Sequence, residues 1–195
     1  MFFQASAILL LLIFYGCYFG KLLSQRRKGI RTDQLGRGKK GFVRLIELSV
    51  KAAAAAVPAA EVISIVLNVS GLPSPFRWAG LILALAGDVF FLCALITMRD
   101  SWRAGVSGEE KTELVTSGVF SISRNPAFLG FDLVYLGMAL TFFSWPLTLL
   151  SAFAALLLHL QIVNVEEDFL IAAFGQDYLD YRGRVCRYLG RKPRS

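Results

Sequence analysis

The sequence has little of what most catalytic and metal-binding motifs require. It holds three cysteines, Cys17, Cys93 and Cys186, and one histidine, His159. The cysteines lie far apart and form no CxxC pair or Cys/His cluster, so their spacing indicates neither a disulfide framework nor a metal site. A Walker loop, an HExxH helix and the chain order of a Ser-His-Asp triad are also missing. These absences disfavour hydrolysis and phosphoryl transfer.

Charged residues are scarce as well. Only 18% of the 195 residues are charged, 55% are hydrophobic, and the mean hydropathy is +0.56. An ordinary soluble domain is less apolar than this, so the composition predicts a membrane protein. The net charge of +7 does not indicate nucleic-acid binding, because the basic residues crowd beside apolar segments and follow no nucleic-acid-binding fold pattern. We expect no nucleic-acid partner.

Long apolar runs are what the sequence does contain. A membrane-spanning helix needs about 20 mostly apolar residues. Stretches that meet this length run over 3–23, 45–69, 78–98, 127–145 and 147–165. No basic leader precedes the first stretch and no small-residue cleavage site follows it, so we expect it to remain as a helix. The predicted fold class is all-α, a polytopic membrane protein with five transmembrane helices and a cytoplasmic C-terminal helical segment.

Basic residues are distributed unequally between the connecting segments. Residues 21–44 are rich in Lys and Arg and hold one acid, Asp33, and the tail after residue 166 is also rich in arginine. The segments on the opposite side carry a single charge, Arg77. The positive-inside rule therefore places the N-terminus outside and the C-terminus in the cytoplasm. We expect an integral protein of the inner, cytoplasmic membrane.

Acidic residues inside the predicted spans need protein or water around them. Placing a charged side chain in lipid costs roughly several kcal/mol of free energy, so Glu61, Asp88 and Asp132 are expected to point into the helix bundle. For Glu61 and Asp88 a structural role is the simpler interpretation. Asp132 has two interpretations that stay open, the lining of a ligand route and the pairing of helices.

The tail after residue 164 has a helical pattern interrupted by Gly175. Acidic residues suit its start and the glycine suits a C-cap, so the pattern predicts two helices. Tyr178, Tyr181, Val185 and Tyr188 follow at helical spacing, which is typical of residues that pack on a core. We therefore expect the tail to fold back onto an apolar surface.

Polar residues from distant parts of the sequence are predicted to meet at the cytoplasmic face. They are the segment 121–126, the pair Glu166 and Glu167, and the tail arginines. Pro126 suits the first turn of a helix, with Ser121 or Ser123 as its cap, and free amides at 123–126 would favour an anion. Adjacent carboxylates point to different sides of a helix, so Glu166 and Glu167 are not expected to act as one pair.

Two motifs carry a resemblance to a known family. "LVTSGVFSISRNPAFLG", then an apolar hairpin, then "EEDFLIAAFGQDYLDYRGRVCRYL" resembles the isoprenylcysteine carboxyl methyltransferase family and its phospholipid methyltransferase-like relatives. The resemblance covers residues 95–190. It implies that the two motifs bracket S-adenosylmethionine at the cytoplasmic face. Matching positions are Gly118, Arg124, Asn125, Pro126 and Gly130 in the first motif, and Glu166, Glu167, Phe174, Gly175, Tyr178, Tyr181 and Arg187 in the second.

The resemblance implies S-adenosylmethionine-dependent methyl transfer to a lipophilic acceptor, a carboxylate, an amine or a thiol. Residues 1–195 would then form one membrane domain, with 99–130 and 164–190 as its cofactor-binding part. Arg124 and Glu167 are expected to contact the cofactor from opposite sides of one cleft. The expected cofactor-binding residues are Gly118, Arg124, Asn125, Pro126, Phe128, Gly130, Glu166, Glu167, Tyr178 and Tyr181. The candidate catalytic residues are Glu166, His159 and Arg187; an amine or thiol acceptor would need Glu166 or His159 as a base.

The chain departs from the family pattern at one place, and two alternative functions stay open. The better-known members have His-Pro-x-Tyr where this chain has the residues 125–128, Asn-Pro-Ala-Phe. A side-chain amide thus replaces an imidazole, and a ring without a hydroxyl replaces a tyrosine. The segment "FGQDYLDYRGRV" also resembles membrane NADPH-dependent reductases of the sterol reductase type. The second alternative is a membrane partner protein without enzymatic activity.

Overall fold

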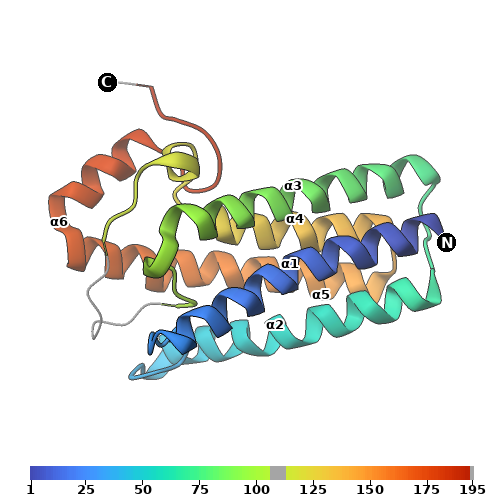
Figure 1. The fold of residues 1–195 in the computed structure, drawn as a ribbon, viewed down its shortest axis with the longest axis horizontal. Coiled ribbons are helices and arrows are strands. Elements are labelled where there is room, and N and C mark those ends of the chain that lie inside the picture. The colour runs from blue at the N-terminus through green and yellow to red at the C-terminus, as the bar shows by residue number, and fades with distance from the viewer. Residues whose placement is uncertain (106–112, 194–195) are drawn as a thin grey trace.

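The computed structural model describes residues 1–105 and 113–193 and shows an elongated bundle of helices (Figure 1). The α-helices are α1 (Phe2–Arg27), α2 (Gly41–Leu67), α3 (Ser74–Met98), α4 (Pro126–Thr141), α5 (Trp145–Gln161) and α6 (Glu167–Arg184). Short helical turns are η1 (Arg99–Ser101), η2 (Gly118–Ser121) and the π-helical turn η3 (Ile162–Glu166). Within the described ranges there are no strands, only two isolated bridges. The predicted all-α membrane fold is confirmed.

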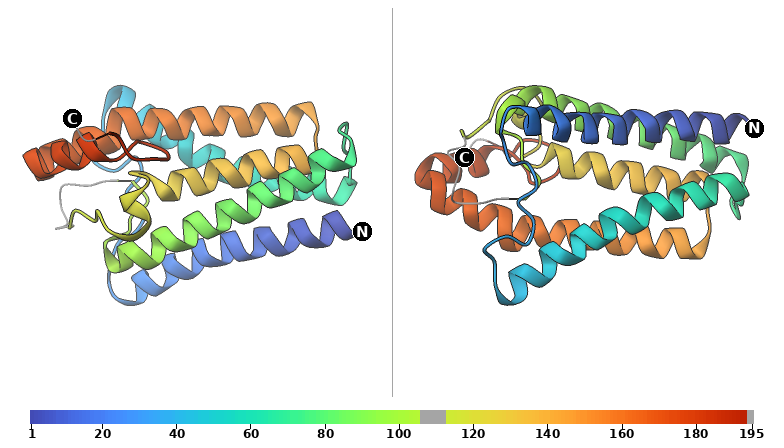
Figure 2. Two further views of the ribbon diagram at one scale, coloured as in Figure 1. Left: turned by 90° about the horizontal axis from the view of Figure 1, so that it is seen from above. Right: turned by 60° about the horizontal axis from the view of Figure 1, so that its bottom comes forward.

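Each apolar stretch predicted from the sequence contains a helix, but the fourth, 127–145, is helical only to Thr141, and the second, 45–69, only to Leu67. Four helical runs are long and apolar enough to cross a membrane, Phe2–Arg27, Gly41–Leu67, Ser74–Ser101 and Trp145–Arg184. The fifth, α4, is also apolar but has 16 residues, which span about 24 Å at 1.5 Å per residue. It ends at Thr141 and lies beside α3 inside the bundle (Figure 2).

Glycines allow α3 and α4 to approach each other closely along a line that we call the glycine seam. A Cβ atom at Gly87 would lie 2.7 Å from the Gly130 carbonyl oxygen, and one at Gly137 would lie 2.5 Å from the Gly80 carbonyl oxygen. Small residues at helix interfaces permit this backbone approach in membranes. The seam holds α4, the helix that begins directly after Arg124 and Asn125, against the long helix α3.

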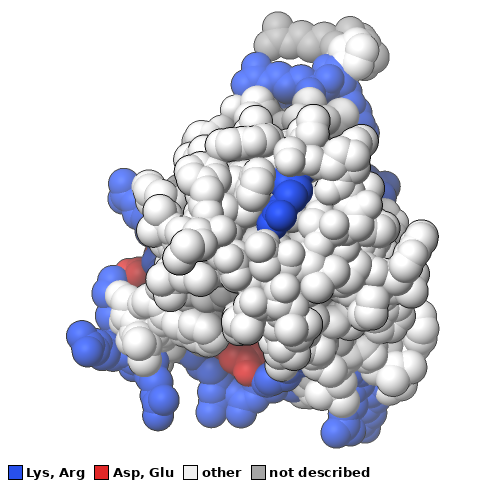
Figure 3. Space-filling model, turned by 90° about the vertical axis from the view of Figure 1, so that its right-hand side faces the viewer, with Lys and Arg blue, Asp and Glu red and all other residues white. Residues whose placement is uncertain are grey.

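The two ends of the bundle differ in their connections. At the short-loop end, residues 68–73 and 142–144 join the helices, and the surface there is almost wholly uncharged, with one basic group in a hollow near its middle (Figure 3). At the other end, which we call the polar end, lie residues 28–40, 99–105, 113–125 and 162–193 (Figure 1). The predicted grouping of the polar segments on one side of the bundle is confirmed.

The tail folds back as the sequence predicts, but its helix ends at Arg184, so Val185 and Tyr188 lie beyond the helix and not on it. Gly175 interrupts α6 with a φ of 51°, a left-handed value that favours glycine. Beyond it, Tyr178, Tyr181 and Val185 pack in one buried cluster with Phe120 and Ala94. The tail is thus part of the folded polar end.

Acidic residues inside the bundle also lie as predicted. Glu61 is fully buried and accepts a hydrogen bond from the Tyr15 hydroxyl at 3.2 Å, and Asp88 is 5% exposed. Asp132 is half-buried. Their side chains therefore face protein, as charges in an apolar solvent must.

Candidate functional site

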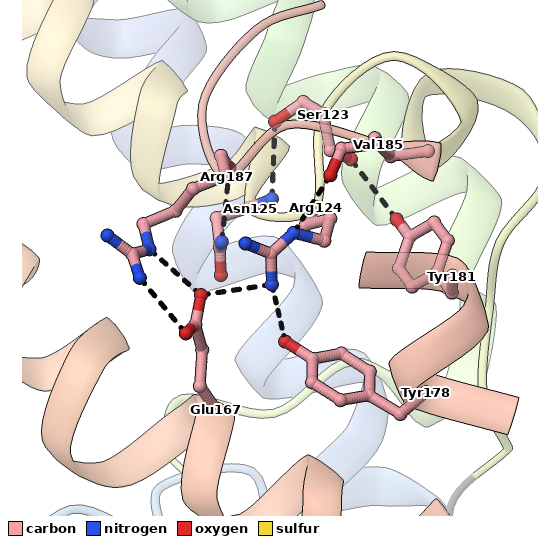
Figure 4. Close-up of polar contacts among 8 residues, drawn as sticks. All are labelled: Ser123, Arg124, Asn125, Glu167, Tyr178, Tyr181, Val185 and Arg187. Atoms are coloured by element: carbon pink, nitrogen blue, oxygen red, sulfur yellow. Dashed lines mark hydrogen bonds and ion pairs between the residues drawn. The ribbon is translucent and has the colours of Figure 1, made fainter. Parts of the chain in front are cut away.

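Glu167 is the centre of a buried charge cluster at the polar end (Figure 4). Arg187 donates from Nε to Glu167 Oε1 at 2.8 Å and from Nη2 to Oε2 at 3.0 Å. Arg124 Nη1 lies 2.9 Å from the same Oε1. The hydrogen bond to Glu167 raises the pKa of Arg187, an effect larger than the lowering by partial burial. One carboxylate therefore joins the first turn of α6, the start of α4 and the tail.

Arg124 does not face Glu167 across a cleft, so this expectation from the sequence is wrong. The two side chains form a direct ion pair, and both are more than nine-tenths buried. Arg124 also donates from Nη1 to the Tyr178 hydroxyl at 2.8 Å and from Nε to the Val185 carbonyl at 3.2 Å. The planar guanidinium suits several acceptors in one plane, and here it binds the tail to the start of α4.

The backbone amides before α4 are occupied, so the prediction of free amides at 123–126 is also wrong. Ser123 N donates to the Val119 carbonyl, and Arg124 N donates to the Cys186 carbonyl, both at 3.1 Å. Asn125 N donates to Ser123 Oγ at 3.2 Å, and Pro126 has no amide hydrogen. The N-cap residue of α4 is Asn125, and no side chain caps the helix. The Arg124 amide pairs with the tail, and the amides of Ser123 and Asn125 pair with nearby residues, so none of these amides is left free for an anion.

The tail loop and the segment before α4 form one hydrogen-bonded unit. Asn125 Nδ2 donates to the Arg187 carbonyl at 3.1 Å, and Gly190 N donates to the Ile122 carbonyl at 2.7 Å. The Tyr181 hydroxyl donates to the Phe120 carbonyl at 2.6 Å. The two motifs that the sequence places far apart are therefore in direct contact.

A pocket opens at the polar end between these motifs, and we call it the terminal pocket. Its walls come from the 98–105 segment, the start of α4, Glu166 and the first half of α6. Its lining includes two arginines, two glutamates and several aromatic rings. The lining residues are Gln34, Met98, Ser101, Trp102, Arg103, Gly105, Glu113, Leu114, Val115, Phe120, Arg124, Asn125, Pro126, Ala127, Phe128, Glu166, Phe169, Leu170, Phe174 and Tyr181.

A second pocket lies deeper among the helices, and we call it the bundle pocket. Its lining is mostly apolar and comes from α1, α2, α4 and α5, together with Leu35 and residues 102–105. The lining residues are Tyr18, Leu35, Val50, Ala53, Ala54, Trp102, Arg103, Ala104, Gly105, Ala127, Phe128, Phe131, Tyr135, Ala154, Leu158 and Gln161. The two pockets share a wall made of Trp102, Arg103, Gly105, Ala127 and Phe128. A polar ligand in the terminal pocket and an apolar ligand in the bundle pocket would meet at this wall.

Glu166 and Glu167 point to different surroundings, as predicted. Glu166 lines the terminal pocket and accepts a hydrogen bond from Gln161 Nε2 at 3.4 Å. Glu167 faces the two arginines instead. The π-helical turn η3 ends at Glu166, and α6 begins at Glu167; such turns occur frequently at functional sites.

Several residues expected at the site have other surroundings. Gly118 adopts a φ of +58°, and Gly130 belongs to the glycine seam. His159 Nδ1 lies 2.6 Å from the Tyr188 hydroxyl, and the two rings stack with centroids 6.0 Å apart. None of these three residues is among the described residues that line either pocket. Glu167 and Tyr178 contact Arg124, which lines the terminal pocket, and Arg187 contacts Glu167. None of the three is among the described residues that line that pocket.

The segment "SWRAG" lies within the expected cofactor-binding part 99–130, but the sequence analysis singled out none of its residues, and it did not name Gln161. Trp102 is 4% exposed, and its carbonyl accepts a hydrogen bond from Gln25 Nε2 at 2.9 Å. This segment pairs with residues 32–34, because Gln34 N donates to the Ala104 carbonyl at 2.9 Å. The available signal for this segment was the pair Trp102 and Arg103, an aromatic and a basic residue side by side in the connection between two apolar stretches. Gln161, a polar residue in an otherwise apolar helix, was the second one.

Comparison with known proteins identifies the family of this chain. The model of the family described as phospholipid methyltransferase matches residues 76–177. The chain belongs to this family. The match begins in α3 and runs through α4 and α5 into α6, so it covers the glycine seam, Arg124 and Glu167 of the charge cluster, and much of the terminal pocket. Arg187 lies beyond its end.

Curated relatives carry the name protein-S-isoprenylcysteine O-methyltransferase. The Xenopus laevis protein is 33% identical over 109 residues, which are 54% of this chain and 38% of that protein. The Schizosaccharomyces pombe protein is 32% identical over 72 residues, 37% of this chain and 30% of that protein. Enzyme A of Arabidopsis thaliana is 30% identical over 109 residues, 55% of each chain. The matched part is thus between about a third and about a half of each of these relatives.

Proposed function

We propose that this chain transfers a methyl group from S-adenosylmethionine to a lipophilic acceptor at the cytoplasmic face of a membrane. The observation that carries the proposal is the wall shared by the terminal pocket and the bundle pocket. A charged cofactor suits the first pocket and an apolar chain suits the second. Family membership supports the same activity.

The terminal pocket offers groups that match the parts of the cofactor. Arg124 and Arg103 are cations for its carboxylate, Glu166 is an acid for its ammonium, and Phe128 and Phe174 are rings for its adenine. When bound, S-adenosylmethionine supplies an electrophilic methyl group on a sulfonium. The residues around it would then hold the acceptor in line with that group, and such orientation alone can supply as much as about 7–11 kcal/mol of the barrier.

The charge cluster has a supporting role in this proposal. Glu167, Arg187 and Tyr178 fix Arg124, which lines the terminal pocket. Asn125 stands beside it, held by the Arg187 carbonyl. The positive-inside rule supports a cytoplasmic polar end, because the basic segments 28–40 and 182–193 lie there.

A pair of variants tests each pocket separately. Phe174 lines only the terminal pocket, so Phe174→Ala should weaken S-adenosylmethionine binding, measured by calorimetry in nanodiscs, by about 0.5–1.5 kcal/mol. Ala54 is exposed and lines only the bundle pocket, so Ala54→Phe should leave that affinity unchanged. It should nevertheless reduce transfer of labelled methyl groups to a membrane lipid extract.

The alternatives predict other outcomes in the same preparation. A reductase of the sterol reductase type would bind NADPH in calorimetry. A partner protein without activity would bind neither cofactor. Wild-type protein that binds no S-adenosylmethionine and transfers no label would refute the proposed function.

A further inference from the structure

Arg77, in the first turn of α3, is a single charge at the short-loop end of the bundle. It is the only Lys, Arg, Asp or Glu within residues 62–87, and residues 1–20 and 133–165 contain none. These ranges include the short loops and the adjoining ends of α1 to α5 (Figure 1). Figure 3 looks onto this end and shows one basic group in a hollow of an uncharged surface. The short-loop end therefore carries a cation without a neighbouring acid.

The side chain of Arg77 is held between the ends of four helices. Its Cζ atom lies 4.3 Å from the ring centroid of Phe3 in α1 and 5.0 Å from that of Phe142, the C-cap of α4. Its Nη2 donates to Oδ1 of Asn68, the C-cap of α2, at 2.8 Å. The faces of aromatic rings attract a cation, so these contacts fix the guanidinium where α1, α2, α3 and α4 meet.

Most donors of this guanidinium have no partner among the described residues. An arginine has five N–H donors, and the bond to Asn68 uses one of them. Nε is buried and unpaired, whereas Nη1 is unpaired but keeps accessible surface. In the described part of the chain no carboxylate forms an ion pair with Arg77. The Nη donors can therefore reach an anion that enters the hollow from outside.

Exposed aromatic side chains indicate the depth of Arg77 in a membrane. Phe2, Phe76, Trp78 and Trp145 are each about half exposed or more. Trp78 packs on Phe2 with the ring centroids 5.0 Å apart. Tryptophans at the ends of membrane-spanning helices are typical of the region of the lipid head groups. Arg77 thus lies where phospholipids carry their phosphate groups.

We propose that Arg77 binds the phosphate group of a phospholipid at the membrane surface opposite the polar end. A guanidinium pairs with phosphate through charge-assisted, often bidentate, hydrogen bonds. Phosphate is also the anion that every phospholipid presents at this depth. Exposed apolar side chains of α1 and α3, among them Leu9, Ile82 and Leu85, offer a surface for the acyl chains.

This lipid is a structural partner and not the methyl acceptor. Arg77 and Met98 lie at opposite ends of α3, about 30 Å apart at a rise of 1.5 Å per residue. Met98 lines the terminal pocket, so the lipid site is remote from the proposed site of methyl transfer. Because Arg77 contacts several helices at once, a phosphate bound to it should stabilise the folded bundle, as does any ligand that binds only the native state.

The test uses the full chain in maltoside micelles and a phosphatidylglycerol analogue with a photoreactive diazirine in its head group. Mass spectrometry reads the label on residues 1–4, 68–78 and 142–145 alone, so lipid bound at the polar end does not contribute. The unlabelled competitors are dioctanoyl-phosphatidylglycerol, dioctanoylglycerol with the same chains but no phosphate, and inorganic phosphate. We expect the phospholipid to compete at least about tenfold more strongly than either of the others, since only it has both the phosphate and the chains.

The matched variants are Arg77→Gln and Arg44→Gln. Arg77→Gln removes the charge and should weaken labelling of the short-loop end about tenfold, the effect of a lost charge-assisted hydrogen bond. It should also abolish the rise in melting temperature that dioctanoyl-phosphatidylglycerol gives the wild type. Arg44 is exposed at the start of α2, at the other end of the bundle, so Arg44→Gln makes the same change in net charge and should leave this labelling unchanged. The wild-type competition tests the site even if Arg77→Gln does not fold.

The outcomes separate this site from the proposed function. Equal competition by dioctanoylglycerol and the phospholipid, or unchanged labelling in folded Arg77→Gln, would overturn the site. Inorganic phosphate that competes as strongly as the phospholipid would show a site for free anions and overturn its assignment to a lipid. Labelling of the short-loop end requires no methyl donor. A wild type that is labelled there but binds no S-adenosylmethionine would therefore refute the proposed function alone.

Discussion

The glycine seam and the charge cluster both hold α4 in place, but by different forces. The seam joins α3 and α4 by backbone contact, with Gly87 and Gly130 in close approach. The cluster joins the start of α4 to the tail by charge, through Arg124, Glu167 and Arg187. Close packing is distributed along two helices, whereas the cluster concentrates its interactions on one carboxylate. The bundle should therefore survive the loss of the cluster, and the site should not.

The largest effect is expected from Glu167→Gln. Removal of one partner from a buried ion pair costs about 3–5 kcal/mol, because Arg124 then remains buried without its counter-charge. The tail should become sensitive to limited proteolysis and S-adenosylmethionine binding should fall, while circular dichroism still reports helices. Asp168→Asn is the control, since Asp168 is the adjacent, exposed acid. Equal effects of the two variants would contradict the charge cluster.

A smaller effect is expected from Gly87→Ala, which should reduce the stability of the whole bundle. The new methyl group would lie 2.7 Å from the Gly130 carbonyl oxygen, so α3 and α4 must separate. Overpacking of this kind costs typically about 1–3 kcal/mol and should lower the thermal melting temperature of the whole bundle. Gly16 in α1 has no atom within 4 Å of an added Cβ, so Gly16→Ala should be neutral or stabilising. The same sign of shift in both variants would argue against the seam.

Arg124→Lys sharpens the comparison within the cluster. A lysine keeps the charge but cannot reproduce the fork that reaches Glu167, Tyr178 and the Val185 carbonyl together. We expect a loss of about 1–2 kcal/mol in S-adenosylmethionine affinity by calorimetry, from the lost charge-assisted bonds. Arg191→Lys is the control, since Arg191 is exposed and donates to the Ser121 carbonyl. If Arg124→Lys binds as well as the control, charge alone is sufficient at this position.

The smallest effect is expected from Tyr188→Phe. It removes the hydrogen bond to His159 but keeps the stacked rings, so thermal stability should fall by about 0.5–1.5 kcal/mol.

His159→Phe should retain most methyl transfer, because His159 contacts the tail and lines neither pocket. Loss of transfer in a folded His159→Phe protein would instead restore His159 as the base.

Much of the fold was predictable because its signals are local. Each predicted span contains a helix, and the break at Gly175 follows from one residue with a left-handed φ. The fold of the tail follows from the helical spacing of Tyr178 and Tyr181, both of which are buried. Apolar length, charge and helical period act within a few residues of one another, so the sequence reports them directly.

The site was predictable only in part. The motifs identified Arg124, Asn125, Phe128, Glu166 and Tyr181, which line the terminal pocket. They did not show that the amides before α4 are paired with the tail, or that Arg124 bonds Glu167 directly. Such pairings depend on how distant segments pack, which a local pattern does not contain.

By itself the sequence determined an all-α membrane protein with its polar segments at one end, since solvation of apolar and charged residues leaves few other arrangements. Only the tertiary structure decided that two pockets share a wall, and that Gln161 is buried at the lining of one of them. The physical reason is that the position of a side chain in the bundle depends on how its helix is rotated and shifted against its neighbours. The close approach of α3 and α4 and the π-helical turn after α5 set the rotation and depth of each side chain, and those follow from packing between helices.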